Sequence, residues 1–376
     1  MTSKENAQKA IAMIAVKHTG LENSMAEKFA CMTIGLIEFG SVKITRLAQG
    51  FSGVLASCTR GLERFYTNNF ISTMDLGLMV YDILSLAGRG PFTIIIDRTD
   101  WIFGITHINI FVVSILFRNT VIPLLVDVSN KAGTSNFKER KKLIDQLVSL
   151  LGKENIKTII GDREFIGDEW FQDLHKNKIP FIFRIRNNLY VTTAELGRVR
   201  VDVLMGDVKQ HETKQMNVII SKIPVRLAAT LSETGELVIV IASRVPGNIL
   251  KRYKTRWFIE LFFKSIKSMG FNLEETHITD PDRIKILMAA IAVATCLVVQ
   301  SGLFKHRIKP IPRKKHGRNA FSVFNYGLKF IRRIFQNGVE VFVQELRPYL
   351  VQKKVPPNIL ASVFFAFILG DYFVGY

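Results

Sequence analysis

The sequence predicts a mixed α/β fold, in which a core that contains a sheet is flanked by helical regions at both ends of the chain. Apolar residues recur at spacings of three and four over residues 3–87, which is typical of amphipathic helices. After the Gly-Arg-Gly-Pro segment at 88–91, short apolar runs alternate with helical patterns, which is typical of α/β layers. The chain has 376 residues, of which 48% are hydrophobic, and this suffices for two or three domains with a substantial core.

Residues 1–88 are expected to form a helical N-terminal domain. Within it, the segments ITRLAQGF and ASCTRGLERFY are separated by SGVL, and they carry Arg46, Arg60 and Arg64. Two short helical segments of this kind are compatible with a DNA-binding helix-turn-helix. Plain packing of helices in a core explains the pattern at least as well.

The α/β core is expected to comprise residues 89–186 and 248–304. Its first strand, FTIII at 92–96, is expected to be buried and to end at Asp97. A short strand, KTII at 157–160, leads in the same way to Asp162. The other expected elements are strands at 105–117, 121–128 and 180–186 and helices at 136–151 and 169–176.

Residues 187–247 are expected to form a β-rich insertion, with strands in VRVDVLM, MNVIISKI and ELVIVIAS. The helical period returns at 249–269, and a second helix at 286–304 follows the capping segment Thr-Asp-Pro-Asp at 279–282. Residues 305–376 are expected to form a helical C-terminal region. It begins with KHRIKPIPRKKHGR, which has seven Lys or Arg residues and no acid, and which is either a solvated linker or a phosphate-binding arm.

Composition limits the partners and the location of the chain. The net charge of +19 favours a polyanionic partner, either nucleic acid or an anionic membrane. Three widely spaced cysteines without a CxxC pair argue against a disulfide framework and a cysteine zinc site, and they favour a reducing compartment. No GxxxxGK[ST] motif is present, so ATP is not an expected ligand.

Two apolar segments raise the question of a membrane. Residues 286–304 carry no charge and are nearly long enough to cross a bilayer, but their Ala, Thr, Gln and Ser content favours a buried core helix. The run ILASVFFAFILG at 359–370 is too short to span. The polar N-terminus lacks the pattern of a secretion signal, so a cytoplasmic protein without a membrane partner is expected.

Asp97 and Asp162 are candidate metal ligands because each directly follows an apolar strand, where a buried acid is costly. If the two strands are neighbours, the carboxylates emerge side by side and form an oxygen-rich site suited to Mg²⁺ or Mn²⁺. A turn or cap position is the alternative explanation for each residue.

The helical segment YKTRWFIELFFKSIK carries a polar stripe of Tyr253, Arg256, Glu260 and Lys267. At about 100° per residue these four side chains fall within roughly 60° of the helix circumference. The other faces are apolar, so the helix is expected to be embedded and to present this stripe to a site. An Arg256–Glu260 ion pair within the helix is the simpler alternative, but it leaves Tyr253 and Lys267 unexplained.

The pattern Y-x2-R-x3-E-x6-K formed by these four residues resembles the signature of the insertion sequence family 4 transposases. The segment IIIDRTDW at 94–101 resembles the family's first-aspartate segment, and GDREFIG at 161–167 resembles its second. The resemblance extends from the helical N-terminus to about residue 350. Asp100 stands where the family often has Asn, and we expect it to face solvent. Residues 359–376 do not resemble an ending known for the family.

The resemblance implies a DDE recombinase with an RNase H-like core of mixed sheet. Asp97, Asp162 and Glu260 would be catalytic and would bind two Mg²⁺ ions, with Mn²⁺ as a substitute; Glu164 is a less suitable third ligand than Glu260. The resemblance further implies that the signature cations and tyrosine contact DNA near the cleaved end. The residues expected to contact DNA are Tyr253, Arg256, Lys267, Lys264 and Arg163.

The expected function is cut-and-paste DNA transposition of an insertion sequence, by metal-dependent cleavage and strand transfer at terminal inverted repeats. The expected partners are the terminal repeats and target DNA, and the expected assembly is a homodimer in the synaptic complex. The protein would then work in a prokaryotic cytoplasm, associated with the nucleoid through DNA. The alternatives are an RNase H-like nuclease without strand transfer, an inactive DNA-binding remnant and, from another class, a membrane protein.

Overall fold

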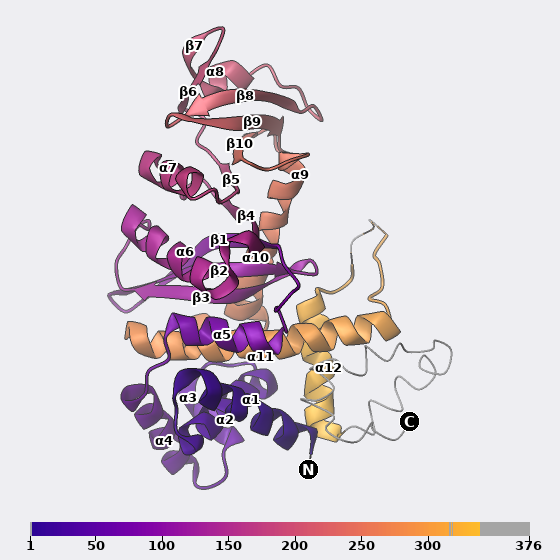
Figure 1. The fold of residues 1–376 in the computed structure, drawn as a ribbon. Helices are drawn as coiled ribbons and strands as arrows, with labels where there is room; N and C mark the ends of the chain where they lie inside the picture. Colours follow the sequence, from indigo (N-terminus) through magenta and orange to yellow (C-terminus); the bar gives the residue numbers. More distant parts are fainter. Residues whose placement is uncertain (1, 316, 318, 339–376) are drawn as a thin grey trace.

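A ten-stranded mixed sheet with helices on both sides forms the centre of the molecule (Figure 1). The computed structural model describes residues 2–338 except 316 and 318. The strand order is β3-β2-β1-β4-β5-β10-β9-β8-β6-β7. The mixed α/β fold predicted from the sequence is therefore confirmed.

The first five strands form an RNase H-like unit. β1, β2 and β3 pair antiparallel, β4 lies parallel to β1, and β5 lies parallel to β4. Helix α6 connects β3 to β4, and helix α7 connects the parallel neighbours β4 and β5, which need a crossover connection. The bounds are β1 Phe92–Phe103, β2 Thr106–Phe117, β3 Thr120–Ser129, α6 Phe137–Leu151, β4 Ile156–Gly161, α7 Asp168–Lys176 and β5 Phe181–Arg184.

The prediction that the first strand ends at Asp97 is wrong, because Asp97 lies in the middle of β1. Antiparallel pairing with β2 continues for six residues beyond Asp97, as far as the Phe103–Thr106 pair. Pairing with β4 has already stopped at Ile95 and Ile160. Asp97 therefore lies on a part of β1 that has no β4 neighbour, next to the loop that leaves β4.

Residues 187–247 extend the same sheet, because β10 pairs with β5. The expected strand in VRVDVLM is only partly correct. Its second half is the short helix α8, since Val201, Leu204 and Met205 bury one face at helical spacing. The strands are β6 Tyr190–Thr193, β7 Gly197–Arg200, β8 Lys214–Ile220, β9 Ile223–Leu231 and β10 Leu237–Ser243, and α8 is Val201–Met205.

Residues 3–83 contain five α-helices and a 3₁₀ turn, and the long helix α11 lies beside α5, between α1–α4 and the sheet (Figure 1). α11 contacts α2, α5 and β3, and α5 contacts β3 as well. Arg46, Arg60 and Arg64 are all exposed on α3 and α4. The bounds are α1 Ser3–Thr19, α2 Asn23–Phe39, α3 Ile44–Leu47, η1 Ala48–Gly50, α4 Leu55–Asn68, α5 Thr73–Ile83 and α11 Pro281–Ile308.

α11 is apolar around its whole circumference because it is covered on all sides. Of the described helices it alone is long and apolar enough to cross a membrane, yet 89% of its most apolar window is buried inside the protein. The core-helix prediction is thus confirmed. The helix α12, Val323–Asn337, packs closely on it. A Cβ on Gly327 would lie 1.9 Å from the Val298 carbonyl oxygen, so this crossing requires glycine. The apolar run 359–370 lies outside the described residues.

The segment 249–269 is helical, but the prediction of one regular helix is wrong. It consists of four successive helical parts, which are an α-helix, a 3₁₀ turn, a second α-helix and a π-turn. The polar residues therefore lie on parts of the backbone that are wound differently. A 3₁₀ turn includes Arg256 and a π-helical turn includes Lys267. The parts are α9 Ile249–Tyr253, η3 Lys254–Arg256, α10 Trp257–Lys264 and the π-turn Ser265–Met269; two further 3₁₀ turns are Lys153–Asn155 and Leu273–Glu275.

Candidate active site

The structure brings the three signature carboxylates and Tyr253 together around the guanidinium group of Arg256. Nη1 of Arg256 donates to Oδ2 of Asp97 at 2.9 Å, and its Nη2 donates to Oε1 of Glu260. The Tyr253 hydroxyl donates to Oδ1 of Asp162 at 3.3 Å. The Tyr253 ring centroid lies 5.8 Å from the guanidinium carbon of Arg256. Residues that are distant in sequence thus form one cluster.

The local sequence explains how the backbone positions Glu260 and Asp162 in the cluster. α10 buries Ile259, Phe262 and Phe263 and contacts β1, which leaves Glu260 at the edge of its buried face, one turn after Arg256. β4 ends at Gly161. Glycine is required at this position because a Cβ would lie 2.9 Å from a ring carbon of Phe183. The strands can therefore approach closely at the point where Asp162 leaves the sheet.

The carboxylates share a buried, charge-compensated environment. Burial raises the pKa of Asp97 to about 6, although the positive charge of Arg256 acts in the opposite direction. The negative charges of Asp162 and Glu260 add to this increase. Burial disfavours the charged form of Arg256, but Tyr253 and the acids outweigh it, and the pKa of Arg256 lies above its usual value. The cluster thus favours a cation at its centre.

A buried arginine that the sequence analysis missed holds the loop after β4. Arg140, on α6, is only 5% exposed. It donates to the carbonyl oxygens of Glu164 at 2.8 Å and Ile166 at 3.0 Å, and to that of Ser135 at 2.7 Å. Its guanidinium also lies 5.4 Å from the centre of the Phe165 ring. Arg140 therefore fixes the backbone just after Asp162.

A second buried pair links the two aspartate segments. Nε of Arg98 donates to Oδ1 of Asn109 at 3.0 Å and lies 3.8 Å from Oε1 of Glu164. Burial raises the pKa of Glu164 to about 7, against the opposing charge of Arg98. Within the described part of the chain, this Glu164 oxygen and Nη1 of Arg98 are buried without a hydrogen-bond partner. Glu164 thus faces Arg98, which also follows Asp97 directly.

These raised pKa values predict that the metal-free protein loses stability as the pH rises. The folded state holds a proton on Glu164 up to about pH 7, whereas the unfolded chain releases it near the ordinary glutamate pKa of 4.5. The resulting stabilisation is present at low pH and is lost as the pH rises through this window. Melting temperatures in EDTA from pH 5 to 8 should fall for the wild type and fall less for Glu164→Gln. Parallel curves for the two proteins would contradict this.

The remaining predicted DNA contacts lie outside the central cluster. Nζ of Lys267 donates to the Asp100 carbonyl oxygen at 3.1 Å and pairs with Glu274 at 2.7 Å. Arg163 and Lys264 are exposed, and the described contacts do not join either to a signature carboxylate. Asp100 is exposed, as expected. The structure therefore separates Lys267 from the tyrosine and arginine of its motif.

The oxygen atoms of the three carboxylates are suitable ligands for a hard divalent cation. In this structure, however, two of these carboxylates bind an arginine side chain. Asp97, Asp162 and Glu260 offer only carboxylate oxygens, the ligands preferred by Mg²⁺ and Mn²⁺. Among the described residues no group of three or more His, Cys, Asp or Glu side chains is arranged to hold a metal ion as it stands. Instead, Arg256 supplies the positive charge between Asp97 and Glu260.

Arg256 is therefore expected to compete with metal ions for the carboxylates. Arg256→Gln should bind Mn²⁺ more tightly than the wild type, because it removes the resident cation and leaves the acids uncompensated. The affinity can be measured from the electron paramagnetic resonance signal of free Mn²⁺. Arg252→Gln removes the same charge from the same helical segment and serves as the control. Equal or weaker Mn²⁺ binding by Arg256→Gln would contradict the competition.

Asp97 lies within β1 and Asp162 directly follows the adjacent strand β4, so the RNase H-like strand order places two acids where a metal-dependent phosphoryl-transfer enzyme could use them. The chain belongs to the transposase DDE domain family, whose model matches residues 94–297, more than half of its length. It is accordingly a DDE transposase, in a family that generally uses divalent metal ions. The matched region contains all three signature carboxylates.

Comparison with solved structures adds a distant likeness. The piggyBac transposase synaptic complex with hairpin DNA, determined by cryo-electron microscopy, has a TM-score of 0.47 and 12% sequence identity to this chain. The match covers 94% of this chain and 80% of the other. No curated protein sequence matches the chain.

Proposed function

We propose that this protein is a cut-and-paste transposase of the insertion sequence family 4. It would cleave phosphodiester bonds at terminal inverted repeats and join the released 3′ ends to target DNA. The observation that carries the proposal is the meeting of Asp97 and Glu260 at Arg256, with Tyr253 on Asp162. Three sequence motifs that resemble the family signature thereby form one cluster inside the matched transposase domain.

Asp97, Asp162 and Glu260 would hold two Mg²⁺ ions, or Mn²⁺ as substitute. When bound, such ions activate the attacking oxygen and stabilise the leaving oxygen of a phosphodiester. Once released from the acids, the Arg256 fork can bind a phosphate through two parallel hydrogen bonds. Lys267, Lys264 and Arg163 would add positive charge for the DNA backbone, and Tyr253 can stack or donate a hydrogen bond.

We further propose that different segments of the chain have different functions. Residues 1–88 would bind the terminal repeats, with Arg46, Arg60 and Arg64 exposed for phosphate contacts. Residues 89–186 and 248–304 would form the catalytic core, with 187–247 inserted into it. Residues 305–376 would help to pair two ends in a homodimer. This work would take place on DNA in a prokaryotic cytoplasm, without ATP.

A donor plasmid that carries the element's own ends tests the proposal. With Mg²⁺ the protein should release the element and join it to a target plasmid, and EDTA should prevent both steps. Metal-dependent cutting without joined product would identify a nuclease that lacks strand transfer. Binding to the ends without cutting, in Mg²⁺ and in Mn²⁺, would identify an inactive DNA-binding remnant.

A further inference from the structure

The basic segment that follows α11 is a built hairpin, which we call the basic hairpin and define as the described residues of 309–320, that is, all except 316 and 318. Its backbone closes through a bridge between Arg313 and Asn319. The Ala320 amide donates to the Pro312 carbonyl oxygen at 2.8 Å. These contacts distinguish the segment from a loose linker, which was one of the two explanations of its sequence.

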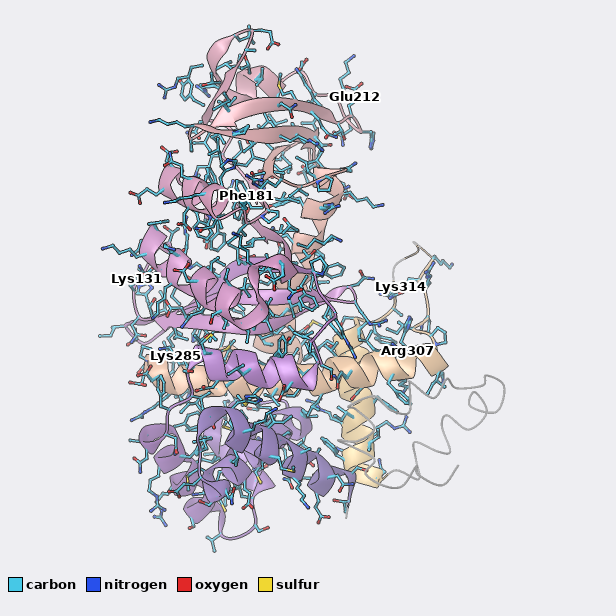
Figure 2. All side chains as sticks on the ribbon, in the orientation of Figure 1. Lys131, Phe181, Glu212, Lys285, Arg307 and Lys314 are labelled. Carbon is cyan, nitrogen blue, oxygen red and sulfur yellow. The ribbon has the colours of Figure 1, made fainter. Side chains whose placement is uncertain are left out.

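The base of the basic hairpin is anchored to the protein. Ile311 is buried, at 3% exposure, and its amide donates to Nδ1 of His306 at 2.9 Å. The Tyr326 hydroxyl of α12 donates to the Lys309 carbonyl oxygen at 3.0 Å. Beyond this base the hairpin projects away from the body of the molecule (Figure 1). Lys314 lies on the projecting part (Figure 2). The base of the hairpin is therefore fixed to the protein.

The exposed surface of the basic hairpin is strongly positive. Arg313, Lys314 and Lys315 are all exposed, and no ion pair within the described residues compensates them. At the end of α11, Arg307 is exposed too (Figure 2). Burial and the charge of Arg118, in the turn between β2 and β3, lower the pKa of Arg307. Neighbouring cations without an acid between them favour a bound anion.

We propose that the basic hairpin, together with Arg118 and Arg307, binds the phosphate backbone of DNA at a second place, apart from the carboxylate cluster. The inference rests on the proposed function, because it takes DNA as the substrate. A lipid surface is disfavoured, since the apolar Ile311 of the hairpin and the adjoining α11 are buried inside the protein. The charges alone remain exposed, which suits phosphates.

The sheet register sets the distance of this second contact from the cluster. Asp97 pairs with Val112 on β2, and Arg118 follows Val112 by six residues along the same hairpin. At about 3.4 Å per residue the separation is roughly 20 Å. Duplex DNA rises about 3.4 Å per base pair, so a phosphate bound by Arg118 would lie about six base pairs from the cleaved bond.

The salt dependence of DNA binding tests this inference on the full-length protein. Each phosphate contact contributes about 0.9 to the slope of log K against log salt concentration. Lys314→Gln/Lys315→Gln and Arg118→Gln/Arg307→Gln should each lower the slope by about 1.8 and weaken binding about thirtyfold at 0.15 M salt. Lys176→Gln/Lys178→Gln, at the end of α7, removes two charges elsewhere and should leave the slope unchanged.

The possible results separate this inference from the proposed function. If the wild type binds and cleaves the element's ends and the hairpin variants keep the control's slope, the inference alone is overturned. If the variants lose binding to anionic vesicles but not to DNA, the partner is lipid and the inference is again overturned. If the wild type does not bind DNA, both fail. All four substituted side chains are exposed, so melting temperatures should stay unchanged.

Discussion

Glu260→Gln should abolish metal-dependent release of the element while the protein still folds and binds the terminal repeats. Glutamine keeps the size of the side chain but cannot offer the negative charge that a divalent ion requires. A rate loss of about a thousandfold or more is expected, which corresponds to roughly 4 kcal/mol in the activation free energy. Single-turnover cleavage of a donor plasmid in Mg²⁺ measures this loss directly.

Glu275→Gln is the matched control for this experiment. Glu275 pairs with Lys43 at 3.4 Å and has a half-exposed side chain, so its ion pair contributes little. The control should cleave at the wild-type rate. Residual cleavage by Glu260→Gln within tenfold of the wild type would remove Glu260 from the catalytic set and would reopen Glu164 as the third acid.

Arg140→Ala should be the most destabilising single change near the site. It removes three hydrogen bonds from a buried charged group to the carbonyl oxygens of Ser135, Glu164 and Ile166. Bonds to charged groups contribute about 1.5–3 kcal/mol each and are not fully additive, so a total near 4 kcal/mol is expected. For a chain of this length that lowers Tm by roughly 5 °C. Differential scanning calorimetry measures the shift.

The adjacent Lys141 provides the control, because it is partly exposed and forms surface ion pairs with Asp145 and Asp173. Lys141→Gln should change the free energy of unfolding by less than about 1 kcal/mol. Arg140→Lys should give an intermediate result, since lysine keeps the charge but lacks the fork that reaches several carbonyl oxygens. If Arg140→Ala melts within 1 °C of Lys141→Gln, Arg140 does not hold the loop.

The sequence predicts the acidic residues of the site better than it predicts the strand pairing and the buried arginine that hold them in place. Asp162 follows an apolar strand, and that local pattern suffices to place it at the end of β4. The position of Asp97 within its strand depends on pairing with β2, which no local pattern contains. Arg140 occupies helical spacing with the buried Leu143, Ile144 and Leu147, so a signal for a buried arginine was present.

The 3₁₀ and π-turns within residues 249–269 could not be predicted from the spacing of apolar residues in the sequence. Apolar spacing over 249–269 is compatible with one regular helix, whereas the structure has a 3₁₀ turn at Arg256 and a π-turn at Lys267. A 3.6-residue period cannot distinguish these states over so few residues. The polar stripe therefore identified the residues that meet the acids but misplaced Lys267, which bonds to the Asp100 carbonyl oxygen.

The burial of α11 has a consequence for the order of events during synthesis. Its apolar surface would be a target for aggregation or membrane insertion if it emerged from the ribosome without partners. Its partners α2, α5 and β3 all precede it along the chain. They are already made when α11 appears, and among its described helical and strand partners only α12 is made afterwards. Moving the coding sequence of α11 ahead of these elements by circular permutation would remove that protection.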